Sequence, residues 1–242
     1  MPLPRRFELK YLLPERLAQA VCAAAAPFVQ PDEHAAAHPR EGYPVCSLYL
    51  DSPGLTLFRQ TVDGWESRFK LRIRLYDSQP DSPVFCEIKR RRNQIIVKQR
   101  VSAPRDLVEQ ALAGQVRPLP ASISPPLTDD AGAIWDEFWR LRDELHADGM
   151  TYVVYRREAY VGKQDDSVRV TFDRQLRGTP YRPGERLHVP TTGTAPPISG
   201  VVLELKFNER FPAWMHQLVQ QFGLERCSVP KYIKCVRSCR QA

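Results

Sequence analysis

Residues 67–76, SRFKLRIRLY, alternate between basic and apolar side chains almost without interruption. A period of two is typical of a β-strand with one buried face, because successive side chains of a strand point to opposite sides of its sheet. The apolar side would pack into a core, and the basic side would place several cations next to one another. The cations are Arg68, Lys70, Arg72 and Arg74, and the apolar residues are Phe69, Leu71, Ile73 and Leu75.

The same alternation recurs in the other segments that we predict to be strands. For any single strand, a solvated face is the simpler explanation of such charges. The set as a whole favours an anion-binding face, because cations outnumber carboxylates on it and the arginine fork suits phosphate oxygens. The charged positions are Arg6, Glu8 and Lys10; Glu87, Lys89 and Arg91; Lys98 and Arg100; Arg157; Arg169; and Glu204 and Lys206.

Strands and helices are interspersed along the chain, with strands in the majority. This order predicts an α+β fold with a largely antiparallel sheet. We expect a single domain over residues 1–242, with an ordered core of about 5–236. The predicted strands are 5–13, 45–51, 67–76, 82–90, 93–102, 151–162, 167–176 and 200–209, the predicted helices are 14–26, 52–64, 104–114, 133–145 and 212–223, loops are expected at 30–44 and 115–130, and 229–236 is a short helix or strand.

The charge balance favours an anionic partner. The chain carries a formal net charge of +7 and has a pI of about 9.2. It contains no run of about 18 apolar residues, so we expect no membrane span. Its six cysteines form no CxxC pair and no metal-ligand spacing with histidine, which predicts reduced thiols in a cytoplasmic protein without a zinc site.

Like charges that lie side by side on a sheet repel one another, so a cationic face is more stable with an anion bound. A closed barrel with this face inward would have no edge strand and a basic interior. A polyphosphate chain or a nucleoside triphosphate would fit such an interior. The few glutamates could then hold Mg²⁺ or Mn²⁺, which prefer oxygen ligands and often bridge carboxylates and phosphates.

Nine short motifs resemble, in order, those of the VTC domain, the polyphosphate polymerase domain of the vacuolar transporter chaperone family within the triphosphate tunnel (CYTH-like) superfamily. The resemblance spans Arg6 to about Val236. It implies a closed eight-stranded antiparallel β-barrel with helices packed outside, and an enzyme that transfers the γ-phosphate of ATP to a growing inorganic polyphosphate chain. The motifs are RRFELKY, SLYLDSP, FKLRIRLY, EIKRR, VKQR, YRREAYV, VRVTFD, LELKF and VPKYIK.

The resemblance also implies roles for individual residues. The metal ligands would be Glu204 and Glu8, and Lys231 and Lys234 would close over the substrate, with Lys234 placed ahead for direct contact. We expect catalytic roles for Arg72, Arg74, Lys89, Arg157 and Lys234, and substrate binding by Lys10, Lys98, Tyr155, Arg169, Lys206 and Lys231.

Three functions remain open at this stage. Related hydrolases carry an ExExK strand, whereas this chain has Arg6, Glu8 and Lys10 at these positions. The loss of one carboxylate disfavours activation of water and favours a polymerase with ATP and polyphosphate as partners. The alternatives are a metal-dependent triphosphatase and a non-catalytic barrel that binds a polyanion. Nucleic acid is not the expected partner, because few aromatic residues share the charged faces.

Overall fold

The computed structural model divides the chain into two compact units, each assembled from separate stretches of sequence. Unit 1 combines Met1–Pro44, Tyr155–Leu176 and Pro197–Lys231, and unit 2 combines Val45–Val154, Arg177–Pro196 and Tyr232–Ala242. The expectation of a single domain stays a prediction. The structure describes residues 6–36, 38, 42–92, 95–114, 129–164 and 167–241, so most of the loop expected at 115–130 lies outside the described residues.

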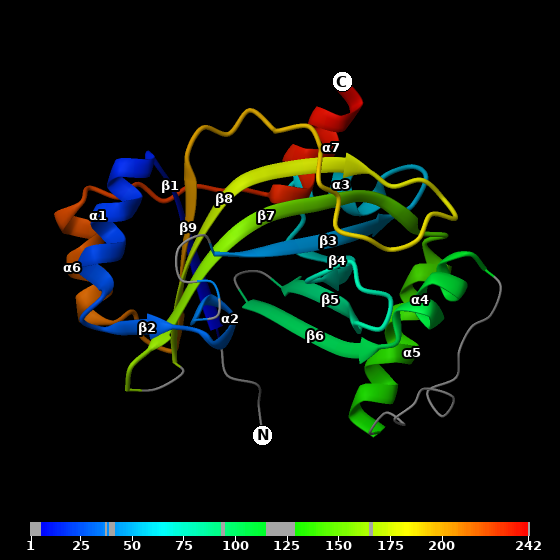
Figure 1. Cartoon of the computed structure of the whole chain (residues 1–242), viewed down its shortest axis with the longest axis horizontal. Coiled ribbons are helices and arrows are strands. Elements are labelled where there is room, and N and C mark those ends of the chain that lie inside the picture. The colour runs from blue at the N-terminus through cyan, green and yellow to red at the C-terminus, as the bar shows by residue number, and fades with distance from the viewer. Residues whose placement is uncertain are drawn as a thin grey trace. The chain divides into compact units, whose positions relative to one another are not determined.

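The strands form one sheet in the order β1-β9-β8-β7-β3-β4-β5-β6, and β2 pairs with β7 (Figure 1). The pairs β1–β9, β8–β9, β2–β7, β3–β4, β4–β5 and β5–β6 are antiparallel, which confirms the predicted fold class. The strands are β1 Arg6–Leu13, β2 Val29–Pro31, β3 Tyr43–Asp51, β4 Ser67–Leu75, β5 Val84–Arg92, β6 Ile95–Ala103, β7 Asp148–Gly162, β8 Val168–Pro180 and β9 Val201–Asn208.

The sheet is not closed into a barrel. Strands β1 and β6 stand at the two ends of the strand order, and no pairing among the described residues joins them. The expected closed eight-stranded barrel is therefore not confirmed. Alternation within a strand predicts which face is buried, but closure depends on the tilt and stagger between strands, which no single strand encodes.

The helices agree with the prediction except in two places. Residues 30–44, expected to be a loop, contain the short elements β2 and α2, which are too brief to show a period in sequence. The last segment, left open as helix or strand, is the helix α7. The helices are α1 Glu15–Ala25, α2 Glu33–Ala36, α3 Thr56–Val62, α4 Arg105–Leu112, α5 Asp129–Glu144, α6 Ala213–Gln221 and α7 Lys231–Gln241.

Unit 1 has its own hydrophobic core, built from β1, β8, β9, α1 and α6. Helix α1 follows Pro14, which has no N–H to satisfy and is tolerated at a helix start. It buries Ala18, Val21 and Ala25, which share one face of the helix because they lie three and four residues apart. Helices α1 and α6 lie side by side (Figure 1).

Unit 2 buries the apolar residues of the alternating segment SRFKLRIRLY. Leu71, Ile73 and Leu75 are fully buried in a core with side chains of β3, β5, β6, α4 and α5. Helix α5 packs on β5 and β6 (Figure 1). It contributes Trp135, Phe138 and Trp139 to this core. The alternation therefore predicted correctly which side of β4 faces a core.

No helix within the described part of the chain is both long and apolar enough to cross a membrane. The six cysteines are present as free thiols.

Asp51, in the motif SLYLDSP, has a structural role. Its carboxylate is fully buried and accepts hydrogen bonds from the backbone N–H groups of Leu57 (2.9 Å) and Phe58 (2.9 Å) in the first turn of α3. It also accepts one from the Tyr232 hydroxyl of α7, at 2.8 Å. Asp51 thus satisfies the free donors at the start of α3 and fastens α7 to the end of β3.

We predict that Asp51→Ala lowers the free energy of unfolding by about 2–4 kcal/mol, because it removes a helix cap and leaves buried donors unsatisfied. Tyr232→Phe should cost about 1 kcal/mol, because it removes only one of these bonds. Urea unfolding measures both. Asp63→Ala, at the exposed C-terminal end of α3, is the control, and equal effects at positions 51 and 63 would contradict the assignment.

Candidate functional site

Strand β9 carries the centre of a buried polar cluster in unit 1. Glu204 and Lys206 share one face of β9 because they lie two residues apart. On the neighbouring strand β1, Lys10 is directly opposite Glu204, and Glu8 is directly opposite Lys206. Register partners on adjacent antiparallel strands have close side chains. We call the following residues the Glu204 cluster: Lys10, Arg157, Asp173, Glu204, Lys206 and Lys231.

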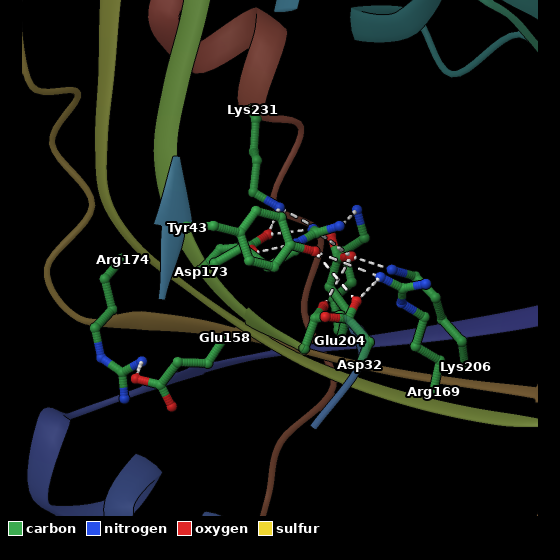
Figure 2. A network of polar contacts seen from close by, with 12 residues as sticks. Asp32, Tyr43, Glu158, Arg169, Asp173, Arg174, Glu204, Lys206 and Lys231 are labelled. Atoms are coloured by element: carbon green, nitrogen blue, oxygen red, sulfur yellow. Dashed lines mark hydrogen bonds and ion pairs between the residues drawn. The ribbon is translucent and has the colours of Figure 1, made fainter. Parts of the chain in front are cut away.

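The Glu204 carboxylate is 4% exposed and is surrounded by four cations (Figure 2). One oxygen, Oε1, lies 2.8 Å from Lys231 Nζ and 3.2 Å from Lys10 Nζ. The other, Oε2, lies 2.6 Å from Lys206 Nζ and 3.3 Å from Arg157 Nη2. The structure therefore brings four of the predicted basic residues together around the predicted metal ligand.

Asp173 supplies a second carboxylate that the sequence analysis missed. It accepts two hydrogen bonds from Arg157, at 2.6 and 2.7 Å, and forms an ion pair with Lys231 at 2.6 Å. This bidentate contact is the strongest geometry available to an arginine. Asp173 has the same parity as Arg169 in VRVTFD and lies inside the predicted strand 167–176, so the parity pattern already placed it on the charged face.

Burial and the neighbouring charges set the pKa values of the cluster. Burial favours the neutral form of Glu204, but Lys206, Lys231 and Lys10 outweigh it and hold the pKa well below the usual value. For Lys206, burial outweighs the attraction of Glu204 and, with repulsion from Arg157, lowers the pKa to about 8. For Lys231, burial opposes the charge, but Asp173 and Glu204 raise the pKa.

Tyr155 and Arg169 flank this cluster. Lys231 Nζ lies 4.9 Å from the centre of the Tyr155 ring, within cation–π range. Arg169, directly opposite Lys206 on β8, forms an ion pair with Asp32 at 2.6 Å. Asp32 also accepts a hydrogen bond from Tyr43, at 3.3 Å. Sequence reasoning missed Asp32, because it lies in a segment expected to be a loop.

A metal ion could use the two predicted ligands. Lys10 Nζ lies 3.1 Å from Glu8 Oε1 and 3.2 Å from Glu204 Oε1, so an ammonium group bridges the two carboxylates where a dication would be attracted. No group of three or more metal-ligating side chains occurs among the described residues. Two carboxylates nevertheless suffice for Mg²⁺ when phosphate oxygens complete the coordination. The donor chemistry therefore fits such a metal.

Unit 2 contains a second polar cluster around Glu87, which sequence reasoning had placed on the charged face without giving it a role. Glu87 is 1% exposed. Its Oε2 accepts from Arg72 Nε at 2.6 Å, and its Oε1 lies 3.3 Å from Lys98 Nζ and 3.4 Å from Arg100 Nε. Burial raises the pKa of Glu87, but the neighbouring cations, Arg72 foremost, lower it far more. We call Arg72, Glu87, Lys98 and Arg100 the Glu87 cluster.

Arg74 and Lys89 are two further cations of this face. Arg74 is 5% exposed, its Nε lacks a hydrogen-bond partner among the described residues, and it appears in no ion pair there. Lys89 lies directly opposite Lys70 on β4 and Lys98 on β6, so three lysines are level across three strands. Opposed like charges destabilise a sheet.

Tyr49 lies beside the Glu87 cluster and was also missed. It is directly opposite Arg72, whose Nη1 lies 3.1 Å from the Tyr49 hydroxyl, and its ring stacks on Tyr232 at 4.7 Å. Burial favours the neutral phenol, but Arg72, Lys70 and Arg74 lower the pKa of Tyr49 to about 8. In SLYLDSP, Tyr49 has the opposite parity to Leu48 and Leu50. This alternation was the signal from which sequence reasoning could have placed Tyr49 on the charged face.

The two lysines of the motif VPKYIK, Lys231 and Lys234, differ in their surroundings. Lys231, at the start of α7, is buried and belongs to the Glu204 cluster. Lys234 lies one turn further along, with its backbone carbonyl accepting a hydrogen bond from Ser238. No contact of the Lys234 side chain with either cluster occurs among the described residues, so its expected catalytic role stays a prediction.

Solved structures resemble this chain in fold at low identity. A Bacillus halodurans protein described as a candidate adenylate cyclase aligns with a TM-score of 0.52 and 10% identity, over 93% of this chain and 94% of its own. A Vibrio parahaemolyticus protein with the same description has a TM-score of 0.47 and 13% identity, over 95% and 97%. A Pyrococcus horikoshii protein has a TM-score of 0.48 and 13% identity, over 96% and 98%.

No curated protein matches the sequence. The VTC domain, in contrast, matches residues 5–240, nearly the whole chain. This match covers both polar clusters and agrees with the resemblance carried by the nine motifs. The chain therefore belongs to the VTC domain family.

Proposed function

We propose that this protein is an ATP-dependent polyphosphate polymerase that transfers the γ-phosphate of ATP to a growing inorganic polyphosphate chain. Membership of the VTC domain family supports an enzyme that handles triphosphate or polyphosphate with a divalent metal. The observation that carries the proposal is Arg74, a buried guanidinium without an ion-pair partner among the described residues. The charge of Arg74 acts on Glu87, but no carboxylate among the described residues forms a direct ion pair with it. A bound phosphate would supply such a direct partner for a buried charge.

The neighbouring charges extend this argument from one phosphate to several. The level row of Lys70, Lys89 and Lys98 lies next to the row of Arg72, Glu87 and Arg100. Cations repeated at the spacing of strands and residues suit a substrate with a negative charge on each phosphorus. Arginine and lysine at fixed positions can also stabilise the charge that spreads over the transferred phosphoryl group.

The state of the carboxylates favours phosphoryl transfer over hydrolysis. A general base works best when its pKa lies near the operating pH. Neighbouring cations hold the pKa of Glu204, Asp173 and Glu87 below the usual values, so these groups are weak bases. A polyphosphate acceptor is already anionic and needs no base. A divalent metal held by Glu204 and Glu8 would neutralise phosphate charge and orient the oxygens.

The direct test is incubation of the protein with ATP and Mn²⁺ or Mg²⁺, followed by separation of polyphosphate, ADP and free phosphate. A polymerase yields polyphosphate and ADP. Release of ADP and free phosphate without polyphosphate would identify a triphosphatase instead. Absence of turnover together with tight tripolyphosphate binding would leave a polyanion-binding protein.

Glu204→Gln should separate the metal role from the phosphate role. We expect metal-dependent turnover of ATP to fall by orders of magnitude, while tripolyphosphate affinity without metal is kept or increases because a negative charge has been removed. The variant also leaves four cations without their shared carboxylate, which should cost about 3–5 kcal/mol of stability. Turnover is therefore measured at a temperature where urea unfolding shows the variant to be folded.

Arg72→Ala is the complementary variant. It should weaken tripolyphosphate binding without metal by about 1.5–3 kcal/mol, the value of a charge-assisted contact. Arg140→Ala removes the same charge from the exposed face of α5, where Arg140 pairs with Glu137, and should leave binding unchanged. Full activity of Glu204→Gln, or equal losses of binding in all three variants, would refute this division of roles.

Lys98 of the Glu87 cluster and the neighbouring Tyr49 together predict a pH dependence of anion binding. Lys98, whose pKa burial lowers to about 8, loses a positive charge above that pH, and Tyr49, with a pKa of about 8, gains a negative one. Bound phosphate favours the protonated forms, so affinity should be constant below about pH 7. Above pH 8 it should fall by up to about tenfold per pH unit for each proton involved.

Tyr49→Phe tests this origin, since it removes one of the two titrations and should flatten the decline. Comparison with the unmodified protein at each pH cancels the titration of tripolyphosphate itself. An identical pH profile in the two proteins would show that the Tyr49 phenol does not contribute.

A further inference from the structure

Unit 1 contains an open cavity of about 1050 Å³ between α1, β2 and the strands β7 and β8. This volume is typical of a small-molecule site. Its lining combines three cations, two carboxylates, three glutamines and one tyrosine. None of the residues expected to bind polyphosphate lines it. The charged lining residues are Arg156, Lys163, Arg174, Glu15 and Glu158.

The cavity lies on the side of β7 and β8 opposite to the Glu204 cluster. Arg157 pairs with Asp173 at 2.6 Å within that cluster, whereas the next residue of each strand forms the pair Glu158–Arg174, at 2.7 Å (Figure 2). Successive strand residues point to opposite faces. The two ion pairs are therefore back to back on the same strands, and only the second one lines the cavity.

Arg174 is held in position by one firm partner and one replaceable partner. Its Nη1 binds Glu158, and its Nε binds both oxygens of Glu15 at 3.0 and 3.1 Å. The Glu15 side chain is 51% exposed and has one other contact, with Gln19 at 3.4 Å. A carboxylate or phosphate of a ligand could take the place of Glu15 on a guanidinium that is already oriented.

Backbone strain at Gln175 adds a second, independent observation. Gln175 lies inside β8 but has a φ of 53°, in the left-handed region that a strand residue with a side chain rarely adopts. In a regular strand, Gln175 would face away from Arg174, yet both residues line the cavity. Strain of this kind costs about 1–3 kcal/mol and is common at binding sites. Here the unusual backbone conformation occurs where two successive residues of β8 both line the cavity.

We propose that this cavity binds a small organic anion that carries a carboxylate or phosphate group together with hydroxyl groups. Arg174, with Lys163 nearby, takes the anionic group. The amides of Gln175 and Gln30 hydrogen bond the hydroxyl groups, and the aliphatic floor formed by Ala23 and Val29 packs against the carbon skeleton. This site is separate from the one proposed for polyphosphate, and its occupancy can be measured without any catalytic assay.

The test is isothermal titration of the full chain with two probes, glucose 6-phosphate and citrate, without tripolyphosphate. Variants of the cavity and of the strand face, described below, distinguish the two places where a probe could bind. We expect one molecule of at least one probe to bind per chain. Binding of glucose 6-phosphate alone identifies a phosphate ester as the ligand class, binding of citrate alone a carboxylate, and binding of both a site that recognises the oxyanion in general.

Variants assign the binding to the cavity. Arg174→Gln should weaken it at least about tenfold, as expected for loss of a charge-assisted contact. Ala23→Trp fills the cavity from the exposed side of α1 without disturbing an ion pair and should abolish binding, whereas Ala213→Trp, exposed at the start of α6, should not.

Absence of heat with both probes would overturn the proposal. So would binding that survives Ala23→Trp, or binding that is lost in Arg72→Ala but kept in Arg174→Gln, since that would place the probe on the cationic strand face. Failure of the polyphosphate polymerase assay has no bearing on these outcomes.

Discussion

Buried cations in this protein gather around a small number of buried carboxylates, and this pairing decides what the strands can carry. Glu204 is in contact with four cationic side chains in unit 1, and Glu87 with three in unit 2. Without these carboxylates, the desolvated ammonium and guanidinium groups would repel one another at short range. The apolar side chains of these strands can pack into a core only because carboxylates compensate the positive charges on the opposite face.

Direct ion pairs do not account for every feature of the charged face among the described residues. Arg74 is buried without an ion-pair partner among the described residues, and Lys70, Lys89 and Lys98 are level with one another. Such an arrangement costs stability in the free protein and is repaid when an anion binds. The same cations hold the carboxylates in their charged, weakly basic form. This charge state supports the proposal that the site stabilises phosphate charge rather than activates water.

Strands β7 and β8 carry different chemistry on their two faces. One face contributes Arg157 and Asp173 to the Glu204 cluster, and the other contributes Glu158 and Arg174 to the cavity beside α1. Alternation along a strand allows this, because neighbouring residues point to opposite faces, and the Glu204 cluster and the cavity share no side chain. Gln175, next to Arg174 on β8, has a positive φ and lines the cavity as well.

Period-two patterns in the sequence were sufficient to predict most strands, their buried faces and the residues of the charged faces. Leu71, Ile73 and Leu75 are buried as expected, because a side chain's face follows from its parity once a strand exists. The α+β class and the antiparallel pairing follow from the same pattern. Parity could not predict which carboxylate would meet which cation, since that depends on the register between strands and on segments distant in sequence.

Only the tertiary structure decided these pairings. It placed Asp173 and Asp32 against Arg157 and Arg169, and it brought Lys231 rather than Lys234 into the Glu204 cluster. It also left the sheet open between β1 and β6 among the described residues, where a closed barrel was expected. The sequence by itself determined which faces are charged, because that is a local property of each strand. The contacts between those charges were decided by the fold, because register, strand tilt and the winding of α7 are properties of the whole chain.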